Sequence, residues 1–465
     1  MRPVAIPPPL ARRLLTNHIM TTAQNGKSSS AAGEVLPQRL PYLDGLRGFA
    51  ALYVAIFHSY QMELFLTGVL DPGRSRLFLF LKPLCMGHYA VTVFIVLSGY
   101  CLMLPVARLG GSYPLKGGLT GFYKRRARRI LPAFYAAVLV TLALLPLTVF
   151  AWNAVSAAGD ANIRAALNPP TVSALVSEVV SHILLLNNGV PIPGESVVRF
   201  TNNIPLWSVA TEWQIYFLFA MLLLPLLRRF GPWSVLVAGF GLGVFFTVGL
   251  HGRYAGACPW MLGVFSLGML GALITHSPHA LHEAFRKKFR WGVLSAITLA
   301  AFLGVGVTNL GFYRLHPILA DTILGLGVMA LLISLAQSSV RRDTRGGRWL
   351  VDLFSSAPAC SLGESSYSLY LLHYPLLILA QALLVQIFPR SLYWVDFMML
   401  VPVMAAIAGI AYLFSLAFER PFLGPNAKPK AAGEPPQGAL IAPKEPVLPA
   451  IASTSSGGSA PPCVT

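Results

Sequence analysis

The chain has 465 residues, of which 55% are hydrophobic and 11% are charged, and its mean hydropathy is +0.64. Because soluble domains carry roughly 25% charged residues, this composition excludes an ordinary soluble protein and indicates a chain that crosses a membrane several times. The net charge of +18 does not indicate nucleic-acid binding, because the basic residues stand in short clusters between apolar segments, as in the cytoplasmic loops of membrane proteins.

Three regions follow one another along the chain. Residues 1–39 are rich in proline, serine and arginine and lack an apolar stretch long enough for a secretory signal, so we expect a disordered basic extension. Residues 40–422 are expected to form one transmembrane domain, and residues 423–465, rich in proline, alanine and serine, a disordered tail. The five cysteines show neither C-x-x-C nor paired spacing, so we expect no disulfide framework and no metal site.

The central region contains ten apolar segments of about the 20 residues that a membrane-spanning helix needs. They cover residues 43–62, 87–106, 130–151, 204–227, 233–250, 256–275, 291–310, 318–337, 366–388 and 394–418. The shorter segment 171–186 holds Glu178 and His182 and predicts an interfacial or partly buried helix rather than a span. The predicted fold is therefore an all-α, polytopic transmembrane helix bundle of about ten spans.

The basic clusters set the expected orientation. They lie at residues 124–129, 228–229, 286–290 and 341–348. With the N-terminus in the cytoplasm, ten spans place all of these clusters on the cytoplasmic side, whereas the opposite loops hold single arginines. We therefore expect both termini in the cytoplasm. The long segment 152–203 then lies on the outer side, where it is either functional or a passive surface loop.

The first span carries two residues that are costly in hydrocarbon. Arg47 lies near its cytoplasmic end and His58 lies 11 residues further on, which is about 16 Å along a helix and almost three whole turns, so both project from one face. Taken alone, each has an ordinary interpretation: Arg47 reaches the lipid phosphates, and His58 packs with a hydrogen bond. Their shared face instead favours a functional pair, with His58 deeper in the membrane.

The next two features are a pair of small residues and a basic junction. Ser98 and Gly99 interrupt the second span, where small side chains allow close helix contact. Immediately before the third span stands KRRARR, with Arg125, Arg126 and Arg129. This cluster either anchors the helix to anionic lipid or holds a phosphorylated ligand, because arginine matches the geometry of phosphate. Arg126 and Arg129 are three residues apart, so on a helix they share a face.

Two later spans contain titratable groups. Glu212 lies about two turns inside the fourth span, and His373 lies inside the ninth. A carboxylate in hydrocarbon must be protonated or partnered, and imidazole titrates near neutral pH. Together with His58, these residues form a candidate acid–base set.

These segments, in this order, resemble the membrane-bound acyltransferase 3 family of O-acyltransferases. The resemblance extends over residues 40–422 and lies in YLDGLRGFAALYVAIFHSY, FIVLSGYCL, RRARRILPAFY, LWSVATEWQIYF, SYSLYLLHYPL and FERPF. Members of the family typically have ten transmembrane helices, and some carry an additional extracytoplasmic esterase-like domain. We expect this chain to be the stand-alone form.

The resemblance implies the substrates and the donor-binding residues. The donor is acyl-coenzyme A, usually acetyl-CoA, which enters from the cytoplasm as a co-substrate; no bound cofactor is implied. The acceptor is a hydroxyl of a saccharide, a glycolipid or a small metabolite. Arg126 and Arg129 match the Arg-x-x-Arg motif associated with CoA binding, and we expect Arg125, in the same cluster, to assist them. Ser98 and Gly99 match the Ser-Gly motif and are assigned to the same donor site.

The resemblance also implies the catalytic residues. His58 matches the essential histidine of the family and Arg47 its partner in the same helix, while Glu212 and His373 match positions of the Trp-Ser-x-x-x-Glu and Tyr-x-x-His motifs. Acyl transfer to an alcohol needs a base that takes the hydroxyl proton, and His58 is the candidate. An acyl-histidine intermediate is the alternative to direct transfer.

The rival function is a proton-coupled secondary transporter, in which buried Glu and His residues relay protons. Against it, the two halves of the chain show no repeat, and the clustered arginines suit a phosphorylated ligand better than a permeation path. We therefore expect a multi-pass enzyme in the lipid bilayer of the plasma or inner membrane, with an acyl-CoA donor and no nucleic-acid partner.

Overall fold

The computed structural model describes residues 40–67, 85–109, 115, 117–156, 172–188, 203–251, 254–340, 345–388 and 398–423. Within these ranges every regular element is a helix and no strand occurs, which confirms the predicted all-α class. Disorder was predicted for residues 1–39 and 423–465, and apart from Leu423 these residues lie outside the described ones.

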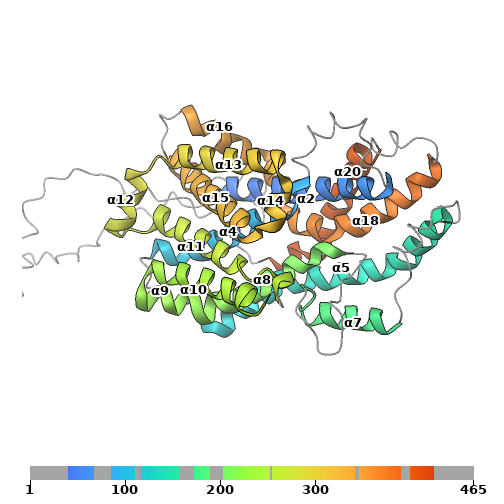
Figure 1. The fold of residues 1–465 in the computed structure, drawn as a ribbon, viewed down its shortest axis with the longest axis horizontal. Coiled ribbons are helices and arrows are strands. Elements are labelled where there is room, and N and C mark those ends of the chain that lie inside the picture. Colours follow the sequence, from blue (N-terminus) through green and yellow to red (C-terminus); the bar gives the residue numbers. More distant parts are fainter. Residues whose placement is uncertain are drawn as a thin grey trace, which may run out of the picture.

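Most of the long helices run side by side along the long axis of the molecule (Figure 1). The uninterrupted ones are α2 (Pro41–Thr67), α4 (His88–Arg108), α5 (Gly118–Ser156), α11 (Met261–His276), α13 (Trp291–Thr308), α15 (Pro317–Val340) and α18 (Ser366–Ile387). Three more long helices contain π-helical or 3₁₀ turns. The first consists of η3 (Ile204–Leu206), α8 (Trp207–Leu218), η4 (Phe219–Leu223) and α9 (Leu224–Phe230). The second consists of α10 (Pro232–Val244) and η5 (Phe245–Gly249), and the third of η7 (Met399–Val403), α20 (Met404–Phe418) and η8 (Arg420–Phe422). The short helices are α7 (Val172–Ile183), η6 (Ala255–Ala257), α12 (Ala280–Lys288), α14 (Leu310–Leu315), α16 (Arg345–Phe354) and α17 (Ala357–Glu364).

Among the described residues, nine helical stretches are long and apolar enough to cross a membrane, and each coincides with one of the predicted spans. The remaining predicted span, residues 43–62, lies in α2, whose 27 residues reach about 40 Å along the helix axis. Helix α2 is as long as the others but less apolar, because it carries Asp44, Arg47 and His58. The chain is therefore an integral, multi-pass membrane protein.

Helix α7 is the element that was predicted not to span. Its 12 residues are too few to cross a bilayer. Val176, Val180 and Ile183 are exposed, whereas Ser181 and His182 are buried against the bundle. Apolar side chains on the outer face and polar ones on the inner face are what an interfacial or partly buried helix has.

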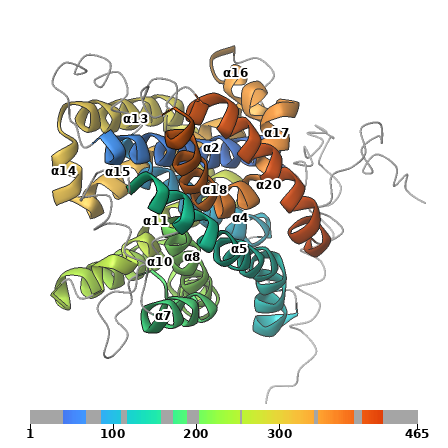
Figure 2. The same ribbon diagram turned by 90° about the vertical axis from the view of Figure 1, so that its right-hand side faces the viewer.

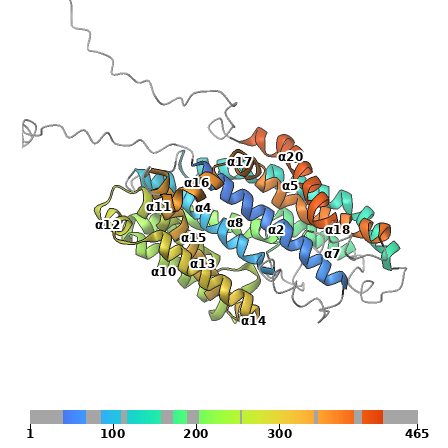
Figure 3. The same ribbon diagram turned by 90° about the horizontal axis from the view of Figure 1, so that it is seen from above.

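Helix α4 forms the centre of the bundle and contacts α2, α11 and α15 (Figure 3). It packs most closely against α11, because both helices place a glycine at the crossing. A Cβ atom added to Gly99 would lie 2.1 Å from the carbonyl oxygen of Phe265, and one added to Gly268 would lie 2.1 Å from that of Val96. On the other side, α18 packs against both α2 and α5 (Figure 2). Helices α2, α4, α5, α8 and α18 together surround the candidate site.

Candidate active site

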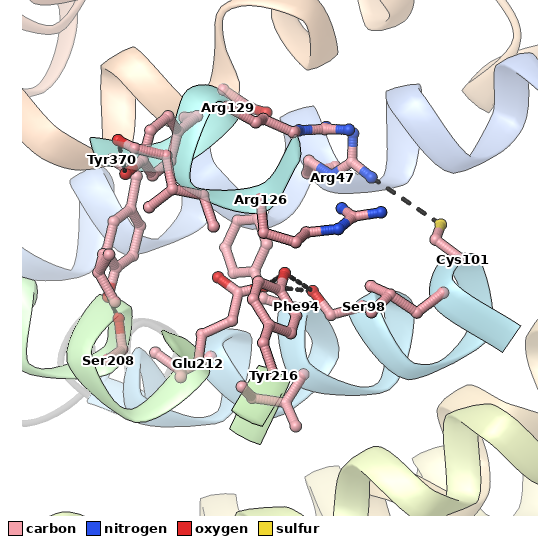
Figure 4. A pocket seen from close by; sticks show the side chains of 17 residues that line it. Arg47, Phe94, Ser98, Cys101, Arg126, Arg129, Ser208, Glu212, Tyr216 and Tyr370 are labelled. Atoms are coloured by element: carbon pink, nitrogen blue, oxygen red, sulfur yellow. Dashed lines mark hydrogen bonds between the residues drawn. The ribbon is translucent and has the colours of Figure 1, made fainter. Parts of the chain in front are cut away.

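A cavity of about 110 Å³ lies among these five helices, and most of the residues predicted from the sequence line it (Figure 4). Arg47 comes from α2, Ser98 from α4, Arg126 and Arg129 from α5, and Glu212 from α8. These residues are separated by up to 165 positions in the chain, so the helix packing alone brings them together. Seven apolar side chains (Cys101 included), three tyrosines and two serines form the rest of the wall.

The three arginines point into the cavity from two helices (Figure 4). Arg126 and Arg129 share a face of α5, as their spacing predicts. The guanidinium of Arg126 lies 5.8 Å from the ring centre of Phe122 and 5.7 Å from that of Tyr216, so two aromatic faces support it. Arg47 is held by Asp44, whose carboxylate lies 3.3 Å from the guanidinium. Among the residues that line the cavity, guanidinium groups outnumber carboxylates, which makes the site suitable for an anion.

Glu212 is the acidic residue that lines this cavity. Its Oε1 atom accepts hydrogen bonds from the hydroxyls of Ser98 and Tyr216, which come from α4 and from the next turn of α8. Two hydroxyl donors on one carboxylate oxygen fix the rotamer of the side chain. The sequence analysis grouped Glu212 with His58 and His373 in one candidate acid–base set. The structure instead pairs it with Ser98 and Tyr216, beside the arginines.

His58 does not line the cavity. Its Nδ1 atom lies 3.1 Å from Oε1 of Gln61, and its ring lies 5.3 Å from that of His373 and 5.0 Å from that of Tyr374, centre to centre. The structure thus brings together the two histidines that the sequence analysis selected, one from α2 and one from α18. It separates them from Glu212, the third member of the predicted set.

His373 is the better defined of the two histidines. It is fully buried, and its Nδ1 atom lies 3.2 Å and 2.8 Å from the carbonyl oxygens of Leu369 and Tyr370. Because a carbonyl oxygen only accepts, Nδ1 carries the proton, and Nε2 keeps a lone pair. Nε2 has no hydrogen-bond partner among the described residues. The ring of His373 also lies 5.7 Å from that of Tyr370, which lines the cavity. The rings of Tyr370, His373 and His58 therefore follow one another, beginning at the wall of the cavity.

Two of the residues assigned to the donor site do not line the cavity. Gly99 faces α11 at the close helix crossing, so its small size serves packing, while the adjacent Ser98 faces the cavity. The side chain of Arg125 is exposed and lies outside the lining of the cavity. Helix geometry explains both, because consecutive residues are about 100° apart and cannot point the same way.

The sequence analysis missed several residues of the wall. Cys101 lies 4.0 Å from the Arg47 guanidinium. Tyr370 exchanges a 2.6 Å hydrogen bond with Ser208 and donates to the carbonyl oxygen of Pro205, which joins α18 to α8. Tyr216 follows Glu212 by four positions, and this spacing was the available signal, because residues four apart share a helix face.

A second buried polar cluster was also missed. Asp321 on α15 is completely buried and is bound by Thr92 at 2.5 Å, by the indole of Trp260 at 2.8 Å and by His88 at 3.2 Å. These contacts join α4, α11 and α15, and the ring of His88 stacks on Trp207 of α8 at 5.7 Å. A carboxylate in hydrocarbon requires such partners. Asp321 follows ILA within an apolar segment, and no sequence motif indicated it.

The arrangement can bind an anion with three guanidinium groups and can accept a proton on the free nitrogen of His373. Within the described ranges, no three His, Cys, Asp or Glu side chains are grouped so that they could hold a metal ion.

Comparison with known proteins gives consistent results. The chain matches the family model for an acyltransferase domain over residues 40–418. It is similar to the O-acetyltransferase OatA of Staphylococcus aureus strain NCTC 8325 / PS 47, with 26% identity over 413 residues, covering 81% of this chain and 57% of that protein. It is also similar to the putative O-acetyltransferase SACOL0978 of S. aureus strain COL, with 26% identity over 386 residues, covering 77% of this chain and 54% of that protein. The chain thus spans little more than half the length of these relatives, and no solved structure is significantly similar to it.

Proposed function

Because the chain belongs to the membrane-bound acyltransferase 3 family, we propose that it is an O-acyltransferase that moves an acyl group, normally acetyl, from acyl-CoA to a hydroxyl of a saccharide, glycolipid or small metabolite. The observation that carries this proposal is the convergence of Arg47, Arg126 and Arg129 on one cavity in the bundle. A structural membrane helix has little reason to place three guanidinium groups around a common cavity, whereas a phosphorylated donor needs them.

In the proposed reaction, the arginines hold the phosphates of CoA and the pantetheine arm extends past Tyr370 toward the histidines. The acceptor hydroxyl gives its proton to His58, and its oxygen attacks the thioester carbonyl. The carbon–sulfur bond then breaks, and the thiolate leaves with CoA and takes up a proton. His373, whose ring lies 5.3 Å from that of His58, is placed to exchange protons with it through small movements or a water molecule.

Glu212 has a positioning role in this scheme. Its carboxylate, fixed by Ser98 and Tyr216, lines the same cavity as the arginines and offsets the repulsion among their like charges. We further propose that the donor enters from the cytoplasm, on the side where the basic clusters lie, and that the enzyme works in the plasma or inner membrane.

The test is transfer of radiolabelled acetyl groups from acetyl-CoA, by membranes containing the protein, to an extract of host glycans and metabolites. We expect the wild-type protein to transfer label and His58→Ala to lose at least about 100-fold in rate, because a positioned general base contributes typically 10²–10⁴-fold. The control is His316→Ala, because His316 is exposed at the end of α14, away from the cavity.

Two results would contradict the proposal. Absence of transfer by a well-folded wild-type protein, with every acceptor fraction, would reject the acyltransferase function. Normal transfer by His58→Ala would leave the enzyme function intact but remove His58 as the base.

A further inference from the structure

Two further cavities lie at the end of the bundle where α2 begins and where α11 and α15 end. The first has a volume of about 300 Å³, and the second a volume of about 280 Å³. Arg286 and Lys287 of α12 and Gln337 of α15 line both, so the two cavities are adjacent chambers of one site. Neither contributes a residue to the candidate active site.

The charge of this site is positive. Arg286, Lys287 and Arg290 are the charged residues among its described lining, and no carboxylate lines either chamber. Lys287 bonds outward to Glu283 at 2.6 Å, and this contact lowers the pKa of the Glu283 carboxyl, so the two charges offset each other at neutral pH. Arg286 donates from one Nη atom to the carbonyl oxygen of Thr275 at 2.8 Å. Among the described residues, the other donors of Arg286 and the guanidinium of Arg290 have no hydrogen-bond or ion-pair partner, so they can bind a ligand.

Each chamber is also lined by a residue that has a buried polar atom without a partner among the described residues. In the first, His276 is 7% exposed; its Nε2 atom lies 2.8 Å from the hydroxyl of Tyr100, whereas Nδ1 has no hydrogen-bond partner among the described residues. In the second, Trp291 is 5% exposed and its indole N–H is likewise unpaired. An indole nitrogen can only donate, and an imidazole nitrogen can donate. Because an unmade buried hydrogen bond is costly, both atoms point to a ligand that supplies acceptors.

We propose that the two chambers form a binding site for a phosphate-bearing anion. Phosphate oxygens only accept hydrogen bonds and carry negative charge, so they match the arginine forks, the indole N–H and the imidazole N–H. Leu281 and Phe285 on α12 and Phe289 directly after it are exposed, so apolar chains could lie beside the site. The headgroup of an anionic phospholipid and a dissolved phosphate compound present the same chemistry. The site does not depend on the proposed acyl transfer.

The test uses the full-length protein in nanodiscs, with its melting temperature measured by intrinsic fluorescence. One arm adds sodium pyrophosphate to nanodiscs of phosphatidylcholine. The other replaces part of the phosphatidylcholine with phosphatidylglycerol and adds no dissolved phosphate. We expect the melting temperature of the wild type to rise in at least one arm, because a ligand that binds only the folded state stabilises it. A rise in the lipid arm alone assigns the site to a headgroup, and a rise in the pyrophosphate arm alone assigns it to a soluble phosphate.

Two variants and two matched controls locate the effect. Arg290→Gln and Trp291→Phe should each require about tenfold more pyrophosphate or phosphatidylglycerol for half of the rise, because each loses a bond to a charged group. Trp291→Phe keeps the packing of the ring and removes only the N–H. Lys288→Gln removes the same charge two positions earlier in the chain, at the end of α12, but Lys288 lines neither chamber, and Trp233→Phe alters an exposed indole. Both controls should respond as the wild type does.

The proposal is overturned by any of three results. The first is that the melting temperature of the wild type does not rise in either arm. The second is that both site variants keep the full response, and the third is that Lys288→Gln loses as much response as Arg290→Gln. The last result would mean that general surface charge, rather than the two chambers, attracts the anion.

Discussion

At the scale of single residues, Arg126 is the arginine of the candidate active site that two aromatic rings position. Its guanidinium lies over the rings of Phe122 and Tyr216 and lines the cavity, next to a carboxylate held by two hydroxyls. Lysine would keep the charge but lose both the planar fork and the stacking on the aromatic faces.

We therefore expect Arg126→Lys to raise the KM for acetyl-CoA about tenfold, which corresponds to the loss of one bond to a charged group, while the KM for the acceptor stays unchanged. Steady-state transfer rates at varied acetyl-CoA measure this. Arg128→Lys is the matched control, because Arg128 is exposed on the same helix and does not line the cavity. Equal donor KM values for Arg126→Lys and the wild type would remove Arg126 from the donor site.

At the scale of elements, the candidate site depends on the crossing of α4 and α11. Gly99 lets the two backbones approach, and this contact fixes the rotation of α4 that turns Ser98 toward Glu212. The buried Asp321 cluster supports the same crossing, because it connects α4 and α11 with α15. The two residues of the Ser-Gly pair thus have different roles: Gly99 allows the close packing of α4 on α11, and Ser98 lines the cavity.

Gly99→Ala should lower the free energy of unfolding by about 1–3 kcal/mol, which is the usual cost of adding a methyl group to a tightly packed contact. The melting temperature in detergent measures the loss. Gly304→Ala on α13 is the control, since nothing lies within 4 Å of the added carbon there, and alanine should be neutral or mildly stabilising. If the two variants melt at the same temperature, the crossing is looser than the structure indicates.

At the scale of the whole molecule, the nine apolar helices and α2 give an even number of predicted crossings, so both ends of the chain should lie on one side. The basic cluster at 286–290, between α11 and α13, favours the cytoplasm for that side. The same side holds the two chambers of the phosphate site.

Alkaline phosphatase, which is active only outside the cytoplasm, can test this orientation in a bacterial host. Fused after His251, between α10 and α11, it should be active; fused after Leu423, behind η8, it should be inactive. Activity of the second fusion would place the C-terminus outside and contradict an even number of crossings with a cytoplasmic N-terminus.

The sequence by itself determined the fold class and the charged residues that line the candidate site. Apolar length fixes which segments can span a bilayer, and this property is local, so all nine described apolar spans fell where they were predicted. Spacing along one helix is local too, which is why Arg126 and Arg129 share a face as expected. Motifs likewise indicated Arg47, Ser98 and Glu212, which line one cavity.

Only the tertiary structure decided which of these residues meet. Whether Glu212 contacts a histidine or a serine depends on how α8 is rotated against α4, and no spacing within either helix encodes that angle. The way in which the other helices are rotated likewise places His58 outside the cavity and beside His373. It also places Gly99 against α11 and buries Asp321 within the bundle. Side chains from distant segments contact one another only after the helices pack, so local patterns select the candidates and packing selects their partners.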